Sequence, residues 1–170
     1  MASTHANRGK ELERLIEASL KQRPLYWQRN HPKTTYANVR GRLQAFPSGD
    51  GPPDYLVATA GLTWLIEAKS FKGTRWQFDG LAKHQADALD LAEAQAGAII
   101  GGVIIGQFTE SDRLIQAWWL SWRTLGPLWR RWQIGMADRG QAGLSVTELQ
   151  ALGAALSGCD FLPAALTERG

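Results

Sequence analysis

Residues 53–69 read PDYLVATAGLTWLIEAK, and this stretch decides the fold. The apolar and β-branched residues are typical of two β-strands joined by a tight turn at Ala60-Gly61. On a strand, residues two apart face the same side, so Glu67 and Lys69 project together. If the strands pair through the turn, Asp54 comes opposite the Glu67 region. We therefore expect two carboxylates and an ammonium at one end of a hairpin.

These residue types suit phosphodiester hydrolysis. Carboxylate oxygens bind a hard cation such as Mg²⁺, which keeps several waters and takes phosphate oxygens as further ligands. The metal polarises the phosphate and lowers the pKa of a bound water, which Lys69 could orient or help to deprotonate. An Asp with a later Glu-x-Lys also arises by chance, and a surface salt bridge is the alternative. The strand placement of Pro53-Asp54 and of Glu67-Ala68-Lys69 favours the nuclease interpretation.

The rest of the chain predicts an α/β fold, a mixed β-sheet core flanked by helices, in one domain spanning 1–170. We expect a helix over 7–21, strands over 55–59, 62–69, 97–105 and 114–120, helices over 81–96 and from 121 to 132, and a helix start capped by Ser145 with Glu148. Residues 22–53 are polar and basic, and 32–46 form either a short hairpin or an exposed loop. Residues 70–80 are expected to be a loop.

Charge and composition limit the function classes. The net charge is +3 and the pI is about 9.2, which permits a polyanionic partner. Basic residues cluster between residues 8 and 42 and around the acidic pair, where they would attract phosphates unless they only form solvated faces. The single Cys159 excludes an internal disulfide and a cysteine-rich zinc site. The longest apolar run, 98–106, is too short to span a bilayer, so we expect a soluble cytoplasmic protein without a membrane partner.

Eight tryptophans are present. Those between residues 118 and 132 suggest a buried core or a subunit interface rather than base stacking; they are Trp118, Trp119, Trp122, Trp129 and Trp132. Trp27 and Trp76 are expected in basic loops, where they are candidates for stacking on unpaired bases, with packing within the loop as the alternative.

The motif Pro53-Asp54 … Glu67-Ala68-Lys69 resembles the signature of the PD-(D/E)xK nuclease superfamily. Within it, the chain is similar to the RecU-type Holliday-junction resolvases, as a bacterial or phage member. The further matching segments are Arg8-Gly9-Lys10-Glu11-Leu12-Glu13, Lys83-His84-Gln85, 97–105, 145–149 and Gly158-Cys159-Asp160-Phe161. Archaeal Hjc-type resolvases share the acidic and basic positions, but the His-Gln pair and the tail favour the RecU branch. The resemblance implies a restriction-endonuclease-like fold, with a stalk-like insertion at about 33–50 that is short here.

The resemblance implies a homodimeric endonuclease, dependent on Mg²⁺ with Mn²⁺ as a substitute, that resolves four-way-junction DNA by paired symmetric nicks in recombination and repair. Asp54 and Glu67 would hold the metal. The catalytic set is Glu13, Asp54, Glu67, Lys69 and Gln85, and the DNA-binding set is Arg8, Lys33, Arg40, Arg42, Lys72, Arg75 and His84. The alternatives are a helix-surface role for Gln85 and a solvated imidazole for His84.

Two other functions stay open at this point. The first is another endonuclease of the superfamily, of repair or restriction type, that cuts duplex or branched DNA. The second is a non-catalytic protein that binds junctions. In either case we expect the protein to act in the cytoplasm of a bacterial cell or a phage-infected host.

Overall fold

The computed structural model describes residues 4–30, 34–39, 42–47, 51–59, 61–95, 99–136 and 141–167, with the backbone alone at 4–6, 34–39 and 42–47. The helices are α1 (Thr4–Leu20), α2 (Lys83–Glu93), α3 (Trp122–Gln133), α4 (Val146–Leu152) and α5 (Leu162–Thr167), with the 3-10 helix η1 (Phe78–Gly80). The strands are β1 (Tyr26–Arg29), β2 (Thr34–Val39), β3 (Arg42–Pro47), β4 (Tyr55–Thr59), β5 (Leu62–Lys72), β6 (Arg75–Gln77), β7 (Ile99–Phe108), β8 (Leu114–Ser121), β9 (Gly143–Ser145) and β10 (Ala154–Leu156).

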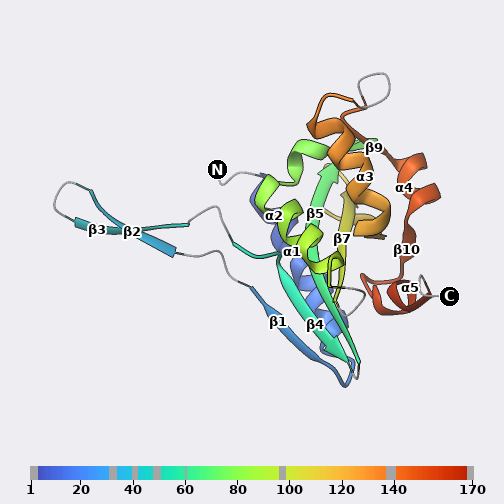
Figure 1. Cartoon of the computed structure of the whole chain (residues 1–170), viewed down its shortest axis with the longest axis horizontal. Coiled ribbons are helices and arrows are strands. Elements are labelled where there is room, and N and C mark those ends of the chain that lie inside the picture. The colour runs from blue at the N-terminus through green and yellow to red at the C-terminus, as the bar shows by residue number, and fades with distance from the viewer. Residues whose placement is uncertain are drawn as a thin grey trace.

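Within the described residues, the main sheet has six strands in the order β1-β4-β5-β7-β8-β10 (Figure 1). Strands β5 and β7 are parallel, and every other pair in this sheet is antiparallel. A parallel pair needs a long crossover connection, and here the connection carries α2. The prediction of an α/β fold with a mixed sheet flanked by helices is confirmed.

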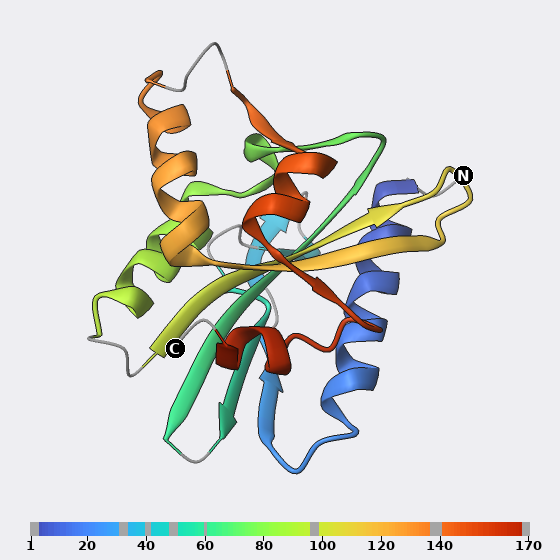
Figure 2. The same cartoon turned by 90° about the vertical axis from the view of Figure 1, so that its right-hand side faces the viewer.

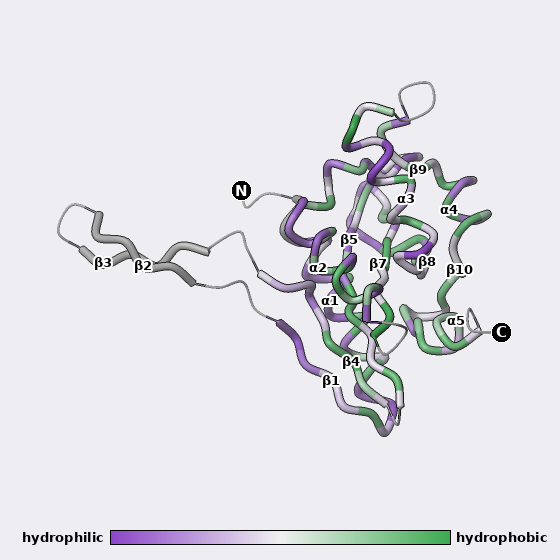
Figure 3. The backbone as a smooth tube through the Cα atoms, in the orientation of Figure 1, coloured by the Kyte–Doolittle hydropathy of each residue, from purple (hydrophilic) through white to green (hydrophobic). Residues whose placement is uncertain are grey.

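Helices cover both faces of this sheet (Figure 2). Side chains alternate between the faces along a strand, so Ile104 of β7 joins one core cluster while Val103 joins the other. Helix α1 packs on the first face through Leu12 and Ile16, and α2 and α3 pack on the second. Hydrophobic and hydrophilic residues alternate along these helices in Figure 3, as expected when one stripe is buried.

The late tryptophans lie in this core. Trp118, Trp119, Trp122 and Trp129 are at most 4% exposed, which confirms the core interpretation for these four. Trp119 lies so close over Gly102 of β7 that a Cβ at that position would be 2.1 Å from the indole. Any larger residue at position 102 would collide with this ring, so the aromatic cluster requires a glycine that no local pattern predicted.

The predicted loop over 70–80 is wrong. Strand β5 continues to Lys72 because it pairs with β7 up to Phe108, and Trp76 of β6 pairs opposite Leu144 of β9. The partner strands come from distant parts of the chain, so local sequence could not reveal them. Trp76 is only 2% exposed and packs against Phe78, which favours packing over base stacking.

The segment 22–53 also contains more regular structure than expected. Strand β1 pairs with β4 along the edge of the main sheet, and its Trp27 packs against Tyr55 rather than lying in a loop. Strands β2 and β3 form a separate two-stranded antiparallel sheet that stands apart from the main sheet in Figure 1. The hairpin alternative for 32–46 is therefore correct. Parts of the stalk-like segment 33–50 lie outside the described residues, and its reach into a junction stays a prediction.

The other predicted elements differ mainly at their ends. Helix α2 spans Lys83–Glu93 within the predicted 81–96, while β7 and β8 extend past the predicted strand ends at 105 and 120. The cap at Ser145 is confirmed, since its hydroxyl accepts from the Glu148 N–H and the Glu148 carboxylate accepts from the Ser145 N–H. Among the described helices, none combines the length and apolar character that a membrane crossing requires.

Candidate active site

The β4–β5 pairing brings Asp54 and Glu67 together. Tyr55 pairs with Ile66, so Asp54, one residue before β4, lies level with Glu67 on β5. An oxygen of the Asp54 carboxylate accepts a hydrogen bond of 2.9 Å from the backbone N–H of Ala68. This contact fixes the Asp54 side chain where the sequence places it, at the end of the hairpin.

The end of β1 holds the backbone before β4. The Asn30 N–H donates to the Asp54 carbonyl at 2.7 Å, and the Asn30 side-chain amide donates to the Pro53 carbonyl at 2.7 Å. Asn30 therefore fixes the Pro53-Asp54 peptide from the neighbouring strand. No motif pointed to this residue.

Glu67, Lys69 and Gln85 form a hydrogen-bonded cluster. The Lys69 Nζ lies 2.9 Å from the Glu67 Oε1 and also donates to the Gln85 Oε1 at 2.9 Å. The Gln85 amide donates to the same Glu67 oxygen at 2.6 Å. The Gln85 Oε1 further accepts from the Ala82 N–H at 3.1 Å, which ties the side chain to the start of α2. Gln85 faces the site, as one of the two interpretations expected.

Glu67 is the most deeply buried carboxyl of the site. Its residue is 1% exposed, and its Oε2 has no hydrogen-bond partner among the described residues. Burial raises the pKa of Glu67 to about 8; the Lys69 ammonium opposes this rise and the Asp54 carboxylate adds to it. A buried polar oxygen without a partner is costly, so such an atom requires a ligand or a proton.

Glu13 lies on α1 beside the same site. Its carboxylate pairs with Arg29 of β1, and Arg29 also donates to Glu17 at 3.2 Å. Burial raises the pKa of Glu13; Arg29 opposes the rise and the nearby Asp54 adds to it. Arg29 and Glu17 were missed by sequence reasoning, because nothing in the local pattern brings β1 against α1. The catalytic role that the resemblance implies for Glu13 stays a prediction.

The residues present fit a magnesium ion. Within the described part of the chain, no three His, Cys, Asp or Glu side chains gather into a ready metal-binding group. Magnesium is commonly held by one or two protein carboxylates and completed by water and substrate phosphates. Asp54 together with the unpartnered Glu67 oxygen suits that mode, and Mn²⁺ binds the same oxygen ligands. Which residues hold the metal stays a prediction.

The predicted DNA-binding residues differ in how exposed they are and in the contacts that they already make within the protein. Arg8 is 3% exposed and lies 3.8 Å from the Asp112 carboxylate. The Lys72 ammonium contacts the same carboxylate at 3.0 Å, and Arg75 donates to the Gly143 carbonyl at 2.8 Å. His84 is half-buried in the first turn of α2. Lys33 and Arg40 lie outside the described residues. Only the backbone of Arg42 is described.

The raised pKa of Glu67 makes metal-free stability pH-dependent. The folded state keeps this proton up to about pH 8, while the unfolded state releases it near 4.5, the ordinary value for a glutamic acid side chain. Between these values the unfolded state binds fewer protons, so the free energy of unfolding falls as pH rises, by about 1.4 kcal/mol per unit of pKa difference. The contribution is complete below the unfolded pKa and lost as pH rises through the folded one.

We therefore expect the Tm of the metal-free protein to fall from about pH 5 to about pH 8, as measured by calorimetry in EDTA. Glu67→Gln should flatten this slope, because the amide does not titrate. Glu13→Gln should flatten it less, since the pKa of Glu13 is raised in the same direction from a less buried position. A Tm that is constant or rises over this range would contradict the burial assigned to Glu67.

No protein-family model matches the chain, and no curated protein sequence matches it. Among solved structures, the chain is similar to Hjc, a Holliday junction resolvase from the archaeal hyperthermophile Archaeoglobus fulgidus, with a TM-score of 0.48. The identity is 14%, and the match covers 89% of this chain and 98% of that one. The assignment to the RecU branch stays a prediction.

Proposed function

We propose that this protein is a Mg²⁺-dependent endonuclease that resolves four-way-junction DNA by paired nicks in recombination and repair. The observation that carries the proposal is the state of Glu67. One of its buried oxygens is held by Lys69 and Gln85, and the other has no hydrogen-bond partner among the described residues. Asp54 lies level with it across the hairpin. A carboxyl built in this way is prepared for a ligand.

This arrangement argues against a purely structural salt bridge. Surface ion pairs contribute little and need no burial. Glu67 is instead 1% exposed. The Lys69 ammonium and the Gln85 amide both contact the same oxygen of its carboxyl group. A structural role would be served as well with both oxygens bonded. The unsatisfied oxygen supports a functional role.

The chain's own residues divide the chemistry. Asp54 and Glu67 would hold the metal, which when bound supplies polarisation of the phosphate and a more acidic water. The Lys69 ammonium would orient the attacking water and neutralise charge on the phosphate, at a position fixed by the Gln85 carbonyl. Glu13, held by Arg29, would keep negative charge beside Asp54 on the α1 side of the site. A contact restricts the side chain of each of these residues, which supports the role proposed for it.

The choice of a junction rests on the sequence resemblance and on symmetry. A four-way junction has approximate two-fold symmetry, so two like sites in a C2 homodimer can nick strands of like polarity. Lys72, Arg75 and His84, with the basic residues of 33–42, would contact phosphates, whereas Arg8 is only 3% exposed and is too buried to reach one. DNA shape rather than base sequence would then select the substrate.

Cleavage of two substrates tests the proposal. The protein is incubated with a synthetic four-way junction and with linear duplex of equal length, with Mg²⁺ and with EDTA. We expect symmetric nicks in the four-way junction but not in the linear duplex, and only when Mg²⁺ is present. Equal cutting of linear duplex would instead assign a repair or restriction type of endonuclease. Tight junction binding without any cutting would assign a non-catalytic junction-binding protein.

A further inference from the structure

Strand β5 has an open backbone edge beyond the active site. Strand β4 pairs with β5 only as far as Ile66, and the Asp54 side chain takes the N–H of Ala68. Between Ala68 and Lys72, no described strand pairs with the edge of β5 that faces away from β7. An open edge presents unpaired backbone donors and acceptors to whatever lies beside it.

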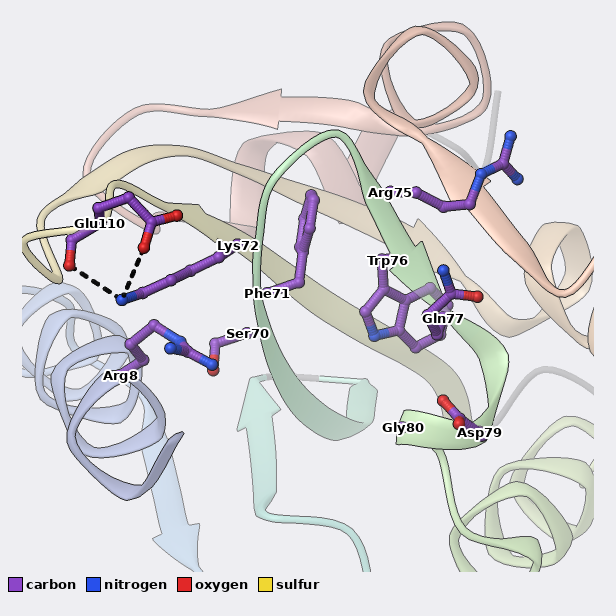
Figure 4. Close-up of a pocket in the computed structure, with 10 residues that line it drawn as sticks. All are labelled: Arg8, Ser70, Phe71, Lys72, Arg75, Trp76, Gln77, Asp79, Gly80 and Glu110. Carbon is purple, nitrogen blue, oxygen red and sulfur yellow. Dashed lines mark hydrogen bonds and ion pairs between the residues drawn. The ribbon is translucent and has the colours of Figure 1, made fainter. Parts of the chain in front are cut away.

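A pocket of about 490 Å³ lies along this edge (Figure 4). Its lining includes Arg8, Ser70, Lys72, Trp76, Gln77 and Asp79. In Figure 4 Arg8, Lys72 and Glu110 lie at one end, and Gln77 and Asp79 lie at the other, with Trp76 next to Gln77. Ligand pockets for small organic molecules span about 300–1,000 Å³, so the volume suits a group larger than a phosphate alone.

The pocket is close enough to the active site to receive the same DNA strand. Ser70 directly follows Lys69, and a strand rises about 3.3 Å per residue, so Lys72 lies about 10 Å further along β5. One strand of duplex DNA advances about 3.4 Å along its axis per nucleotide. Lys72 projects from the face of β5 opposite to Lys69, so a strand whose scissile phosphate is at Lys69 brings a neighbouring nucleotide to this pocket by passing over the open edge of β5.

The cations at the near end already hold anions of the protein itself. The Lys72 ammonium contacts the Asp112 carboxylate at 3.0 Å, the Glu110 carbonyl at 2.9 Å and the Glu110 carboxylate at 3.6 Å. The Asp112 contact is shared with the buried Arg8. The Glu110 side chain, in contrast, is 90% exposed. Of these anions, the Glu110 carboxylate is the one that can leave at little cost.

We propose that this pocket binds one nucleotide of the DNA strand that flanks the scissile phosphate. Its phosphate replaces the Glu110 carboxylate on Lys72, and its sugar and base extend toward the exposed Gln77, beside the buried Trp76. Glu110 is then a built-in competitor for the DNA phosphate. The inference deepens the proposed nuclease function and rests on it.

If Glu110 competes with DNA for Lys72, neutralising the two members of this ion pair should change junction binding in opposite directions. Loss of the Glu110 charge should tighten binding, and loss of the Lys72 charge should weaken it. The chain offers a matched control in Lys83 and Asp87, an exposed ion pair of 2.6 Å on α2 whose residues do not line the pocket. Junction binding is measured by fluorescence anisotropy without divalent metal, over a range of salt concentrations. The variants are Lys72→Gln, Glu110→Gln, Lys83→Gln and Asp87→Asn.

We expect Glu110→Gln to tighten binding about two- to fivefold more than Asp87→Asn, the range for loss of one exposed ion pair. Lys72→Gln should weaken binding more than Lys83→Gln and lower the slope of log K against log salt by about 0.9, as for one lost phosphate contact. A single uncharged methylphosphonate linkage, moved stepwise along the cleaved strand, should abolish the Lys72→Gln effect at one position near the nick.

The outcomes separate the two proposals. If the wild-type protein neither binds nor cuts junctions, the nuclease function itself fails. If it binds and cuts but the pocket variants behave like their controls, only the nucleotide subsite is overturned. The subsite is likewise overturned if no methylphosphonate position changes the effect of Lys72→Gln. Unchanged Tm values for all four variants would confirm that each comparison is made between folded proteins.

Discussion

Asp54→Asn and Glu67→Gln should each lower the rate of junction cleavage on the order of a thousandfold, because a metal's charge stabilisation is worth several kcal/mol. Both substitutions keep the shape of the side chain, and an asparagine carbonyl can still accept the Ala68 N–H that Asp54 holds at 2.9 Å. Junction binding without metal should stay within a fewfold of wild type, since basic residues supply most of the affinity. Single-turnover cleavage with Mg²⁺ and anisotropy in EDTA measure the two quantities.

Asp87→Asn is the control for the loss of one negative charge, since Asp87 pairs with Lys83 on the exposed face of α2. It should cut at the wild-type rate. The Glu67→Gln protein should also be at least as stable as wild type near pH 8, because it no longer carries a buried carboxylate. Wild-type cleavage by either site variant would show that the metal is held elsewhere.

Lys69→Met should reduce cleavage by about a hundredfold or more, the range seen when a donor to transition-state charge is removed. Methionine keeps the apolar part of the chain and removes the ammonium that lies 2.9 Å from Glu67. Gln85→Ala should cost about ten- to a hundredfold, the range for residues that orient groups in direct contact with a metal. The combined variant should lose little more than Lys69→Met, because Gln85 acts by positioning Lys69 and Glu67.

The Lys69 substitution has a second consequence, which tests its ion pair with Glu67 separately from its effect on cleavage. The ammonium lowers the pKa of Glu67, so its removal should raise that pKa further. The fall in metal-free Tm with rising pH should then extend to a higher pH than in wild type. Lys83→Gln, which removes an exposed ammonium on α2, should change neither cleavage nor this profile. Equal losses from Lys83→Gln and Lys69→Met would overturn the role given to Lys69.

The helix α1 illustrates how far local pattern reaches. Leu12, Ile16 and Leu20 recur at helical spacing and are buried against the sheet, as their pattern predicts. The pattern also indicates that Glu13 lies beside the buried stripe. It does not reveal Arg29, which approaches Glu13 from β1. Helical periodicity reports which face is buried, but not what covers it.

In the region after the motif, from Ser70 onward, the local pattern predicted the wrong secondary structure. Ser70 and Lys72 interrupt the apolar pattern, so the chain resembles a loop from Ser70 onward. The strand nevertheless continues, because β7 supplies a partner for each residue through Lys72. Backbone hydrogen bonds to a distant strand outweigh the weak local preference of polar residues.

The stretch 53–69 shows which features of the site the local sequence determines and which depend on the tertiary structure. A two-residue turn and a side-chain period of two are local properties, so the sequence by itself placed Asp54 opposite Glu67 and put Lys69 on the same face. The tertiary structure alone decided that Glu67 is buried, that Gln85 holds it together with Lys69, and that the open edge of β5 borders a pocket. Burial and electrostatic environment depend on contacts between distant segments, which no local pattern encodes.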